Sequence, residues 1–225
     1  MVKSEIITKL IASKIVPVVR GESKEEAVSC SLACIEGGIK SIEVTYTNPY
    51  ASDVIHQLQS RNDKNCIIGA GTVLDEITAR NAILAGAQFI VSPSFNQATA
   101  VLCNRYGIPY FPGCMTVTEI VTSLESGVDM VKIFPGDTVG MSFIKAIKAP
   151  LPQVMVMVTG GVNMSNIEEW FNAGADVLGI GGEFNKLAHQ KKFKMIEDKA
   201  ADYIKLVSSS KNLAFKHSAG KLTKG

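Results

Sequence analysis

The chain repeats a short apolar segment eight times, and this repeat limits the possible folds more than any other feature of the sequence. The segments are rich in β-branched residues and begin about 19–26 residues apart, which leaves room for one helix and two short loops between them. Most are apolar along their whole length, as in strands whose two faces are both covered. The eight predicted strands are Ile15–Arg20, Ser41–Tyr46, Ile67–Thr72, Phe89–Ser94, Tyr110–Met115, Asp129–Phe134, Gln153–Thr159 and Val177–Glu183.

The segments between the predicted strands carry the signals of helix ends. A glycine that follows the last helical turn closes the helix in the left-handed conformation and directs the chain into the next strand. Such glycines precede most of the strands, at Gly37-Gly38, Gly86, Gly107, Gly127 and Gly174. Helix starts are marked by capping-box patterns, in which Ser23, Thr116 and Ser165 each precede a glutamate by three residues.

Eight βα units in 225 residues predict an α/β fold, the (β/α)8 TIM barrel, with an extra N-terminal helix over about Ser4–Ser13. A doubly wound open sheet is the alternative, but no G-x-G-x-x-G pattern follows the first strand. The pattern stops at Val207. We therefore expect a barrel over residues 1–206 and a flexible basic tail over residues 207–225.

Charge, hydropathy and cysteine usage exclude several classes of protein. The net charge is +2, but four of the lysines lie in the tail, and the remainder has 19 basic and 21 acidic residues, a balance unsuited to nucleic acid. The longest apolar run, Val154–Val158, is far too short to span a membrane. No pair among the five cysteines has C-x-x-C spacing, and Lys3 and Glu5 interrupt any secretory signal. We expect a cytoplasmic protein with free, buried thiols.

The sequence also predicts no metal and no cofactor. His56, His189 and His217 fall on predicted helices or in the tail, away from the strand ends, and no two of them have metal-ligand spacing. We interpret them as surface or packing residues.

Two charged residues lie inside apolar predicted strands, Lys132 in the sixth and Glu43 in the second. The carboxyl ends of the strands form the active face of a parallel barrel. Burying an ammonium group without a partner is costly, and the neutral amine is the form that attacks a carbonyl carbon to give a Schiff base. The two residues therefore predict either an internal ion pair or the apparatus for imine formation with proton transfer.

Further candidate groups follow other strands. Arg20 ends the first strand, where a guanidinium suits a substrate carboxylate or phosphate or forms a salt bridge at the rim. Thr72 follows glycines that let a ligand approach the backbone. Glycine pairs at the ends of strands seven and eight predict an anion site or tight turns: Thr159-Gly160-Gly161 and Gly181-Gly182.

These residues resemble a known family, the bifunctional 2-dehydro-3-deoxy-phosphogluconate (KDPG) and 4-hydroxy-2-oxoglutarate (KHG) aldolases. The resemblance covers about residues 5–205. It lies in six motifs, taken in order and spacing: Pro17-Val18-Val19-Arg20, Ile42-Glu43-Val44-Thr45, Ile68-Gly69-Ala70-Gly71-Thr72, Val91-Ser92-Pro93-Ser94, Lys132-Ile133-Phe134-Pro135 and Thr159-Gly160-Gly161-Val162.

The resemblance implies a homotrimeric barrel that performs metal-free class I aldol cleavage of a 2-keto acid to pyruvate and an aldehyde. Lys132 matches the Schiff-base lysine of the family, and Glu43 matches its general acid/base. Of the other matched positions, Arg20 and Thr72 hold the pyruvate carboxylate, and Pro93 and Phe134 line the pocket. The anion site predicted from the glycine pairs consists of Thr159, Gly160, Gly161, Gly181 and Gly182.

The chain departs from the family at two positions. Thr47 stands where some members have an arginine, a charge that Arg20 could supply instead. Glu183 replaces a serine that many members offer to phosphate. Either Glu183 turns away and the backbone amides of Gly161 and Gly182 bind the phosphate, or the preferred substrate lacks one.

Three other functions remain as alternatives at this point. The first is an aldolase for a non-phosphorylated or galactonate-type 2-keto-3-deoxy acid. The second is a sugar-phosphate isomerase or epimerase, which would not need Lys132 as a nucleophile. The third is a non-catalytic sugar-acid binding barrel.

Overall fold

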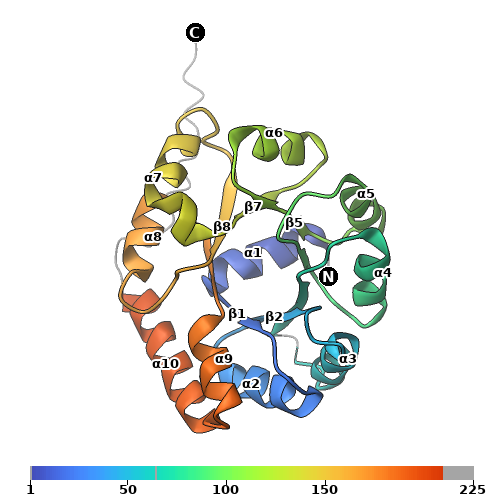
Figure 1. Cartoon of the computed structure of the whole chain (residues 1–225), viewed down its shortest axis with the longest axis vertical. Helices are drawn as coiled ribbons and strands as arrows, with labels where there is room; N and C mark the ends of the chain where they lie inside the picture. Colours follow the sequence, from blue (N-terminus) through green and yellow to red (C-terminus); the bar gives the residue numbers. More distant parts are fainter. Residues whose placement is uncertain (1, 64, 210–225) are drawn as a thin grey trace.

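The computed structural model describes residues 2–63 and 65–209, and they form one parallel barrel surrounded by helices (Figure 1). All strand pairs are parallel, in the order β5-β4-β3-β2-β1-β9-β8-β7-β6. The strands are β1 (Ile15–Val19), β2 (Ser41–Thr45), β3 (Ile67–Gly71), β4 (Ile90–Val91), β5 (Tyr110–Phe111), β6 (Gly113–Cys114), β7 (Met130–Ile133), β8 (Met155–Thr159) and β9 (Val177–Ile180).

The fifth predicted strand is divided at Pro112, which is why nine strands form an eight-stranded barrel. Proline has no backbone N–H to donate to a ladder. Before it, β5 pairs with β4, and after it, β6 pairs with β7. The carbonyl of Pro112 itself accepts a hydrogen bond from the backbone N–H of Lys132 at 2.8 Å. One stretch of chain thus joins the two ends of the sheet and closes the ring, which confirms the predicted barrel.

The helices between the strands cover the outside of the barrel (Figure 1). The described helices are α1 (Lys3–Ser13), α2 (Lys24–Glu36), α3 (Ala51–Ser60), α4 (Glu76–Leu84), α5 (Gln97–Tyr106), α6 (Val117–Glu125), α7 (Gly136–Lys148), α8 (Ile167–Ala173), α9 (Gly182–His189) and α10 (Phe193–Ser209). The extra N-terminal helix is confirmed as α1. The last helix, α10, includes residues 207–209, and residues 210–225 of the predicted tail lie outside the described residues.

Most of the predicted helix-end signals are confirmed. Glycines 38, 86, 107, 127 and 174 all have positive φ. Ser23 caps α2, and Thr116 forms a complete capping box with Glu119 on α6. The prediction for Ser165 is wrong: α8 begins two residues later, after Asn166, and the Ser165 hydroxyl donates instead to Asn163.

Two apolar clusters hold the barrel together. The larger one lies between the outer faces of the strands and the helices. The smaller one fills the barrel interior, where the rings of Phe89 and Phe111 lie 5.9 Å apart beside Met130 and Met157. Ile6, Ile7 and Leu10 of α1 belong to this inner cluster. Since α1 crosses the barrel in Figure 1, it closes the amino-terminal end of the strands.

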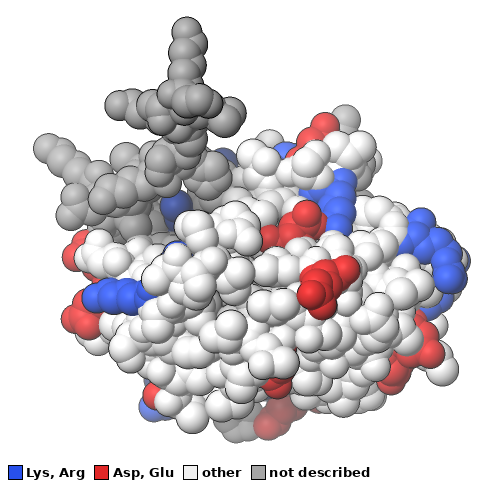
Figure 2. Space-filling view, turned by 90° about the horizontal axis from the view of Figure 1, so that it is seen from above, with Lys and Arg blue, Asp and Glu red and all other residues white. Residues whose placement is uncertain are grey.

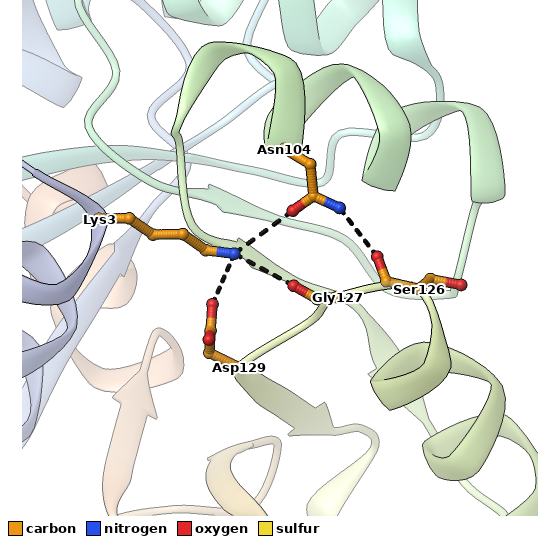
Figure 3. A network of polar contacts seen from close by, with 5 residues as sticks. All are labelled: Lys3, Asn104, Ser126, Gly127 and Asp129. Carbon is orange, nitrogen blue, oxygen red and sulfur yellow. Dashed lines mark hydrogen bonds and ion pairs between the residues drawn. The ribbon is translucent and has the colours of Figure 1, made fainter.

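A polar network fastens the start of α1 to the barrel (Figure 3). The ammonium group of Lys3 lies 2.6 Å from Asp129, which directly precedes β7, and donates to the carbonyl of Gly127 at 3.1 Å and to Asn104 of α5 at 3.3 Å. Asn104 in turn donates to the carbonyl of Ser126. The network joins α1, α5 and the loop before β7 at one point.

The prediction of free, buried thiols is confirmed, since all five cysteines are buried and unpaired. No helix in the described part of the chain has both the length and the apolar character needed to cross a membrane.

Candidate active site

The two-residue period of the strands directs Lys132 and Glu43 into the barrel. Met130 belongs to the inner apolar cluster, so Lys132, two residues later on β7, points to the same side. On β2, Ile42 and Val44 pack against the outer helices, so the intervening Glu43 faces inward. Both side chains therefore stand above the apolar floor of the interior.

Lys132 and Glu43 meet inside the barrel, as the sequence predicted. The Nζ atom of Lys132 lies 3.8 Å from Oε1 of Glu43, close enough for an ion pair but too far for a hydrogen bond. The side chains are 6% and 1% exposed, so almost no bulk water screens the two charges. The Phe134 ring lies 4.9 Å from the same Nζ and covers it from another direction.

Burial sets the protonation of Glu43. Removal of the carboxylate from water raises the pKa of Glu43 above its ordinary value, and the positive charges of Lys132 and Arg20 offset only part of that rise. Within the described part of the chain, neither carboxylate oxygen has a hydrogen-bond partner. A buried carboxyl group with free acceptors and a raised pKa is suited to take up and return a proton during a reaction.

Glycine at position 71 creates the space that Glu43 occupies. A Cβ atom on Gly71 of β3 would lie 2.0 Å from Oε1 and 2.6 Å from Cδ of Glu43. Real atoms do not approach so closely, so the carboxyl group keeps this position only because residue 71 has no side chain. The Gly-Ala-Gly sequence before Thr72 thus makes room for a protein group, in addition to the ligand access predicted from the sequence.

Two asparagines fix the backbone of Arg20 just beyond β1. The amide N–H of Arg20 donates to Oδ1 of Asn185 at 2.8 Å, and its carbonyl accepts from Nδ2 of Asn48 at 2.8 Å. Asn185 also donates to the carbonyls of Val18 and Gly181, which joins β1 to the start of α9. Neither asparagine was predicted from the sequence. Asn48 follows the end of β2, which was a weak signal, whereas Asn185 lies within α9 and gave none.

The remaining predicted pocket residues, Thr72, Pro93 and Phe134, follow β3, β4 and β7 at the carboxyl ends of these strands. Thr72 directly follows Gly71 and has φ of 55°, a left-handed conformation that costs energy for a β-branched residue and is found most often at functional sites. Gly113 of β6 lies opposite Lys132 in the strand register. A side chain at Gly113 would collide with the carbonyl oxygen of Pro93, so the backbone of Pro93 lies directly against β6. Pro93 and Phe134 are both partly exposed.

The predicted anion site lies at the ends of β8 and β9. Gly160 and Gly161 have φ of 101° and 72°, and Gly181 precedes the first turn of α9. A Cβ on Gly182 would meet no atom within 4 Å, so the start of this helix faces open space. Thr159 is 8% exposed, and its hydroxyl has no hydrogen-bond partner among the described residues. Unpaired amides at a helix start and a free hydroxyl can bind an anion.

Glu183 turns away from this open space. Its carboxylate accepts a hydrogen bond from the Tyr203 hydroxyl at 3.0 Å and forms an ion pair with Lys199, both on α10. The structure therefore has Glu183 turned away, whereas binding of phosphate by the amides of Gly161 and Gly182 stays a prediction. The partners of Glu183 could not be predicted, because they lie on a separate helix whose packing the sequence pattern does not specify.

A buried lysine beside a buried glutamate at the carboxyl ends of a parallel barrel is the arrangement expected of one class of protein, the barrel enzymes that bind a carbonyl compound through an amine. The sequence matches the KDPG and KHG aldolase family over residues 6–202. The chain belongs to this family.

Comparison with individual proteins supports this family assignment. The chain is 37% identical to 2-dehydro-3-deoxy-phosphogluconate aldolase of Treponema pallidum, with 76% of this chain and 81% of the relative covered. It is 33% identical to 2-dehydro-3-deoxy-6-phosphogalactonate aldolase of Escherichia coli K12, covering 75% and 83%. The crystal structure of KDPG aldolase from Legionella pneumophila, with pyruvate captured as a covalent carbinolamine, superposes with a TM-score of 0.80 at 28% identity, covering 86% and 95%.

Proposed function

We propose that the protein is a class I aldolase in which Lys132 forms the Schiff base and Glu43 moves the protons. The substrate is a 2-keto-3-deoxy sugar acid such as 2-dehydro-3-deoxy-6-phosphogluconate, or 4-hydroxy-2-oxoglutarate, and the products are pyruvate and an aldehyde. The observation that carries the proposal is the buried contact of 3.8 Å between the two side chains. The reaction needs no cofactor, because the imine itself serves as the electron sink.

The first half of the reaction breaks the C3–C4 bond. The neutral amine of Lys132 attacks C2 of the substrate to give a carbinolamine, which takes up a proton and loses water to form a protonated imine. The Glu43 carboxylate accepts the proton of the C4 hydroxyl, directly or through a water. The C3–C4 bonding electrons move into the imine, which becomes an enamine, while C4 leaves as the carbonyl carbon of the aldehyde.

The second half returns the enzyme to its starting state. Glu43, now protonated, gives its proton to C3 of the enamine, which regenerates the imine. Water adds to C2, and pyruvate leaves as the C–N bond to Lys132 breaks. Proton transfer of this kind contributes about 10²–10⁴-fold to the rate. The raised pKa of Glu43 suits a group that must hold the proton between these two steps.

The polar groups around the pair would bind the two ends of the substrate. Arg20 and Thr72 are assigned to the pyruvate carboxylate, and Pro93 and Phe134 to the walls of the pocket. The anionic far end of the substrate is assigned to Thr159 and the glycines of the anion site, Gly160, Gly161, Gly181 and Gly182. Support comes from the open start of α9 and from the placement of Glu183 on the side of α10.

We assign the protein to a homotrimer in the cytoplasm. Large apolar side chains are exposed on three consecutive units of the barrel, including Ile77 and Leu84 of α4 at 70% and 67%, Val101 and Tyr106 of α5, and Val117 of α6. Figure 2, which views the molecule from the side of α6, shows a surface on which uncharged residues predominate. Contact with a second copy would remove these exposed apolar side chains from water. The five free thiols fit a reducing compartment.

The test is reduction of the protein with borohydride in the presence of pyruvate. Wild type is expected to gain the mass of a reduced pyruvate adduct on Lys132 and to release pyruvate from 2-keto-3-deoxy acids. Lys132→Ala should lose both, whereas Lys148→Ala, which removes a lysine on α7 outside the barrel interior, should keep both. Pyruvate release without any adduct would refute the imine, and absence of both pyruvate release and adduct would favour an isomerase-type reaction or a binding protein.

A further inference from the structure

An acidic residue at the proposed anion site requires an explanation. Glu183 is the second residue of α9, in the first turn of the helix, where the free amides and the helix dipole attract negative charge. A carboxylate side chain can occupy that position itself and would then repel an anionic substrate group. Whether Glu183 repels an anionic substrate group therefore depends on the direction in which its side chain points.

Two residues of α10 hold Glu183 on the outer side. Lys199 pairs with one carboxylate oxygen, and the Tyr203 hydroxyl donates to the other at 3.0 Å. The exposure of the Glu183 side chain is 31% and that of Lys199 is 35%, so the ion pair is partly shielded from water. Tyr203 is fully buried, and its ring packs 5.7 Å from that of Phe184, the residue next to Glu183.

The hydroxyl of Tyr203 stays protonated and can therefore always donate this hydrogen bond to Glu183. Burial and the negative charge of Glu183 both raise the pKa of Tyr203, so the phenol keeps its proton over the whole physiological range. Because Phe184 and Tyr203 pack together, the hydrogen bond is also fixed in direction. Glu183 is therefore held by one group fixed by ring packing, Tyr203, and by one partly exposed cation, Lys199.

We propose that Lys199 and Tyr203 are positioning residues that determine specificity for the far end of the substrate, by holding the Glu183 carboxylate away from the start of α9. This inference rests on the proposed function. The ligand class concerned is a phosphate monoester at the end of the 2-keto-3-deoxy acid. Loss of the cation leaves only the Tyr203 hydrogen bond to hold the carboxylate, which then turns toward the helix start for part of the time and competes there with the phosphate.

The experiment compares Lys199→Ala with Lys205→Ala, which removes an exposed lysine of the same helix that pairs with Asp202. Each is assayed with 2-keto-3-deoxy-6-phosphogluconate and with its non-phosphorylated form. For Lys199→Ala we expect KM for the phosphorylated substrate to rise roughly tenfold, with kcat and the KM for the other substrate nearly unchanged. Lys205→Ala should behave as wild type. An unchanged KM in Lys199→Ala would overturn the proposal.

A second substitution separates an indirect role of Lys199 from a direct contact with phosphate. In the double variant Lys199→Ala/Glu183→Gln the competing charge is gone, so KM for the phosphorylated substrate should return close to the wild-type value. A double variant as impaired as Lys199→Ala would show that Lys199 binds phosphate itself and would refute the role through Glu183. Tyr203→Phe, which keeps the ring packing, should raise KM in the same direction.

These outcomes are distinct from failure of the proposed function. Borohydride trapping with pyruvate reports on Lys132 and does not involve the far end of the substrate. All the α10 variants should therefore be trapped as wild type is. If wild type itself gives neither an adduct nor turnover, the proposed function fails, whatever the α10 variants show.

Discussion

Replacement of Gly71 by alanine tests whether the position of Glu43 controls the rate. The new Cβ would lie 2.0 Å from Oε1 and 2.6 Å from Cδ of Glu43, whereas ordinary contact begins at 3.4 Å. The carboxyl group must therefore move by about 1 Å or more, and a displacement of that size can cost roughly 10²-fold in rate. Overpacking should also lower the free energy of unfolding by about 1–3 kcal/mol.

The assay is steady-state cleavage of 2-keto-3-deoxy-6-phosphogluconate, followed through the release of pyruvate, together with urea unfolding. We expect Gly71→Ala to lose about 10²-fold in kcat while Lys132 still forms the trapped adduct with pyruvate. Gly37→Ala is the matched control, because its Cβ would lie 2.4 Å from the carbonyl oxygen of Glu197, at the packing of α2 against α10. It should lose similar stability and keep kcat. Equal kcat losses in the two variants would refute the reasoning.

Three further predictions concern pH, stability and assembly. Only the carboxylate form of Glu43 accepts a proton, and burial raises the pKa of this group above its ordinary value of 4.5. The value of kcat/KM should therefore fall as the pH decreases, with a midpoint above pH 4.5. A midpoint at or below pH 4.5 would contradict this prediction. Lys3→Met removes the contacts of Lys3 with Asp129 and Gly127, so the free energy of unfolding should fall by about 1 kcal/mol with kcat unchanged. Unaltered urea unfolding would show that the network does not contribute to stability. Ile77→Glu with Leu84→Lys, on α4, should shift sedimentation from the proposed trimer toward monomer, and a trimer unchanged by these substitutions would place the interface elsewhere.

The sequence predicts the barrel well because its repeat reflects simple packing requirements. The apolar runs marked every strand, although β4 has only Ile90 and Val91 and the fifth run is divided at Pro112. The Lys132–Glu43 pair could be predicted because a charge inside an apolar strand is conspicuous. Asn185 could not, since its contact with Arg20 spans 165 residues and asparagine is unremarkable on a helix. The orientation of Glu183 depends in the same way on Lys199 and Tyr203 from another helix.

The closure of one end of the barrel by α1 has a kinetic consequence for the proposed reaction. Within the described part of the chain, Ile6 and Leu10 pack with Phe89, Phe111 and Met157 at one end of the barrel, so the substrate is expected to enter and leave at the opposite mouth. The three-carbon fragment remains bonded to Lys132 after cleavage, below the position of the departing aldehyde. The aldehyde must therefore leave first, and in the condensation direction pyruvate must be loaded first, so the products should inhibit in an ordered and not a random pattern.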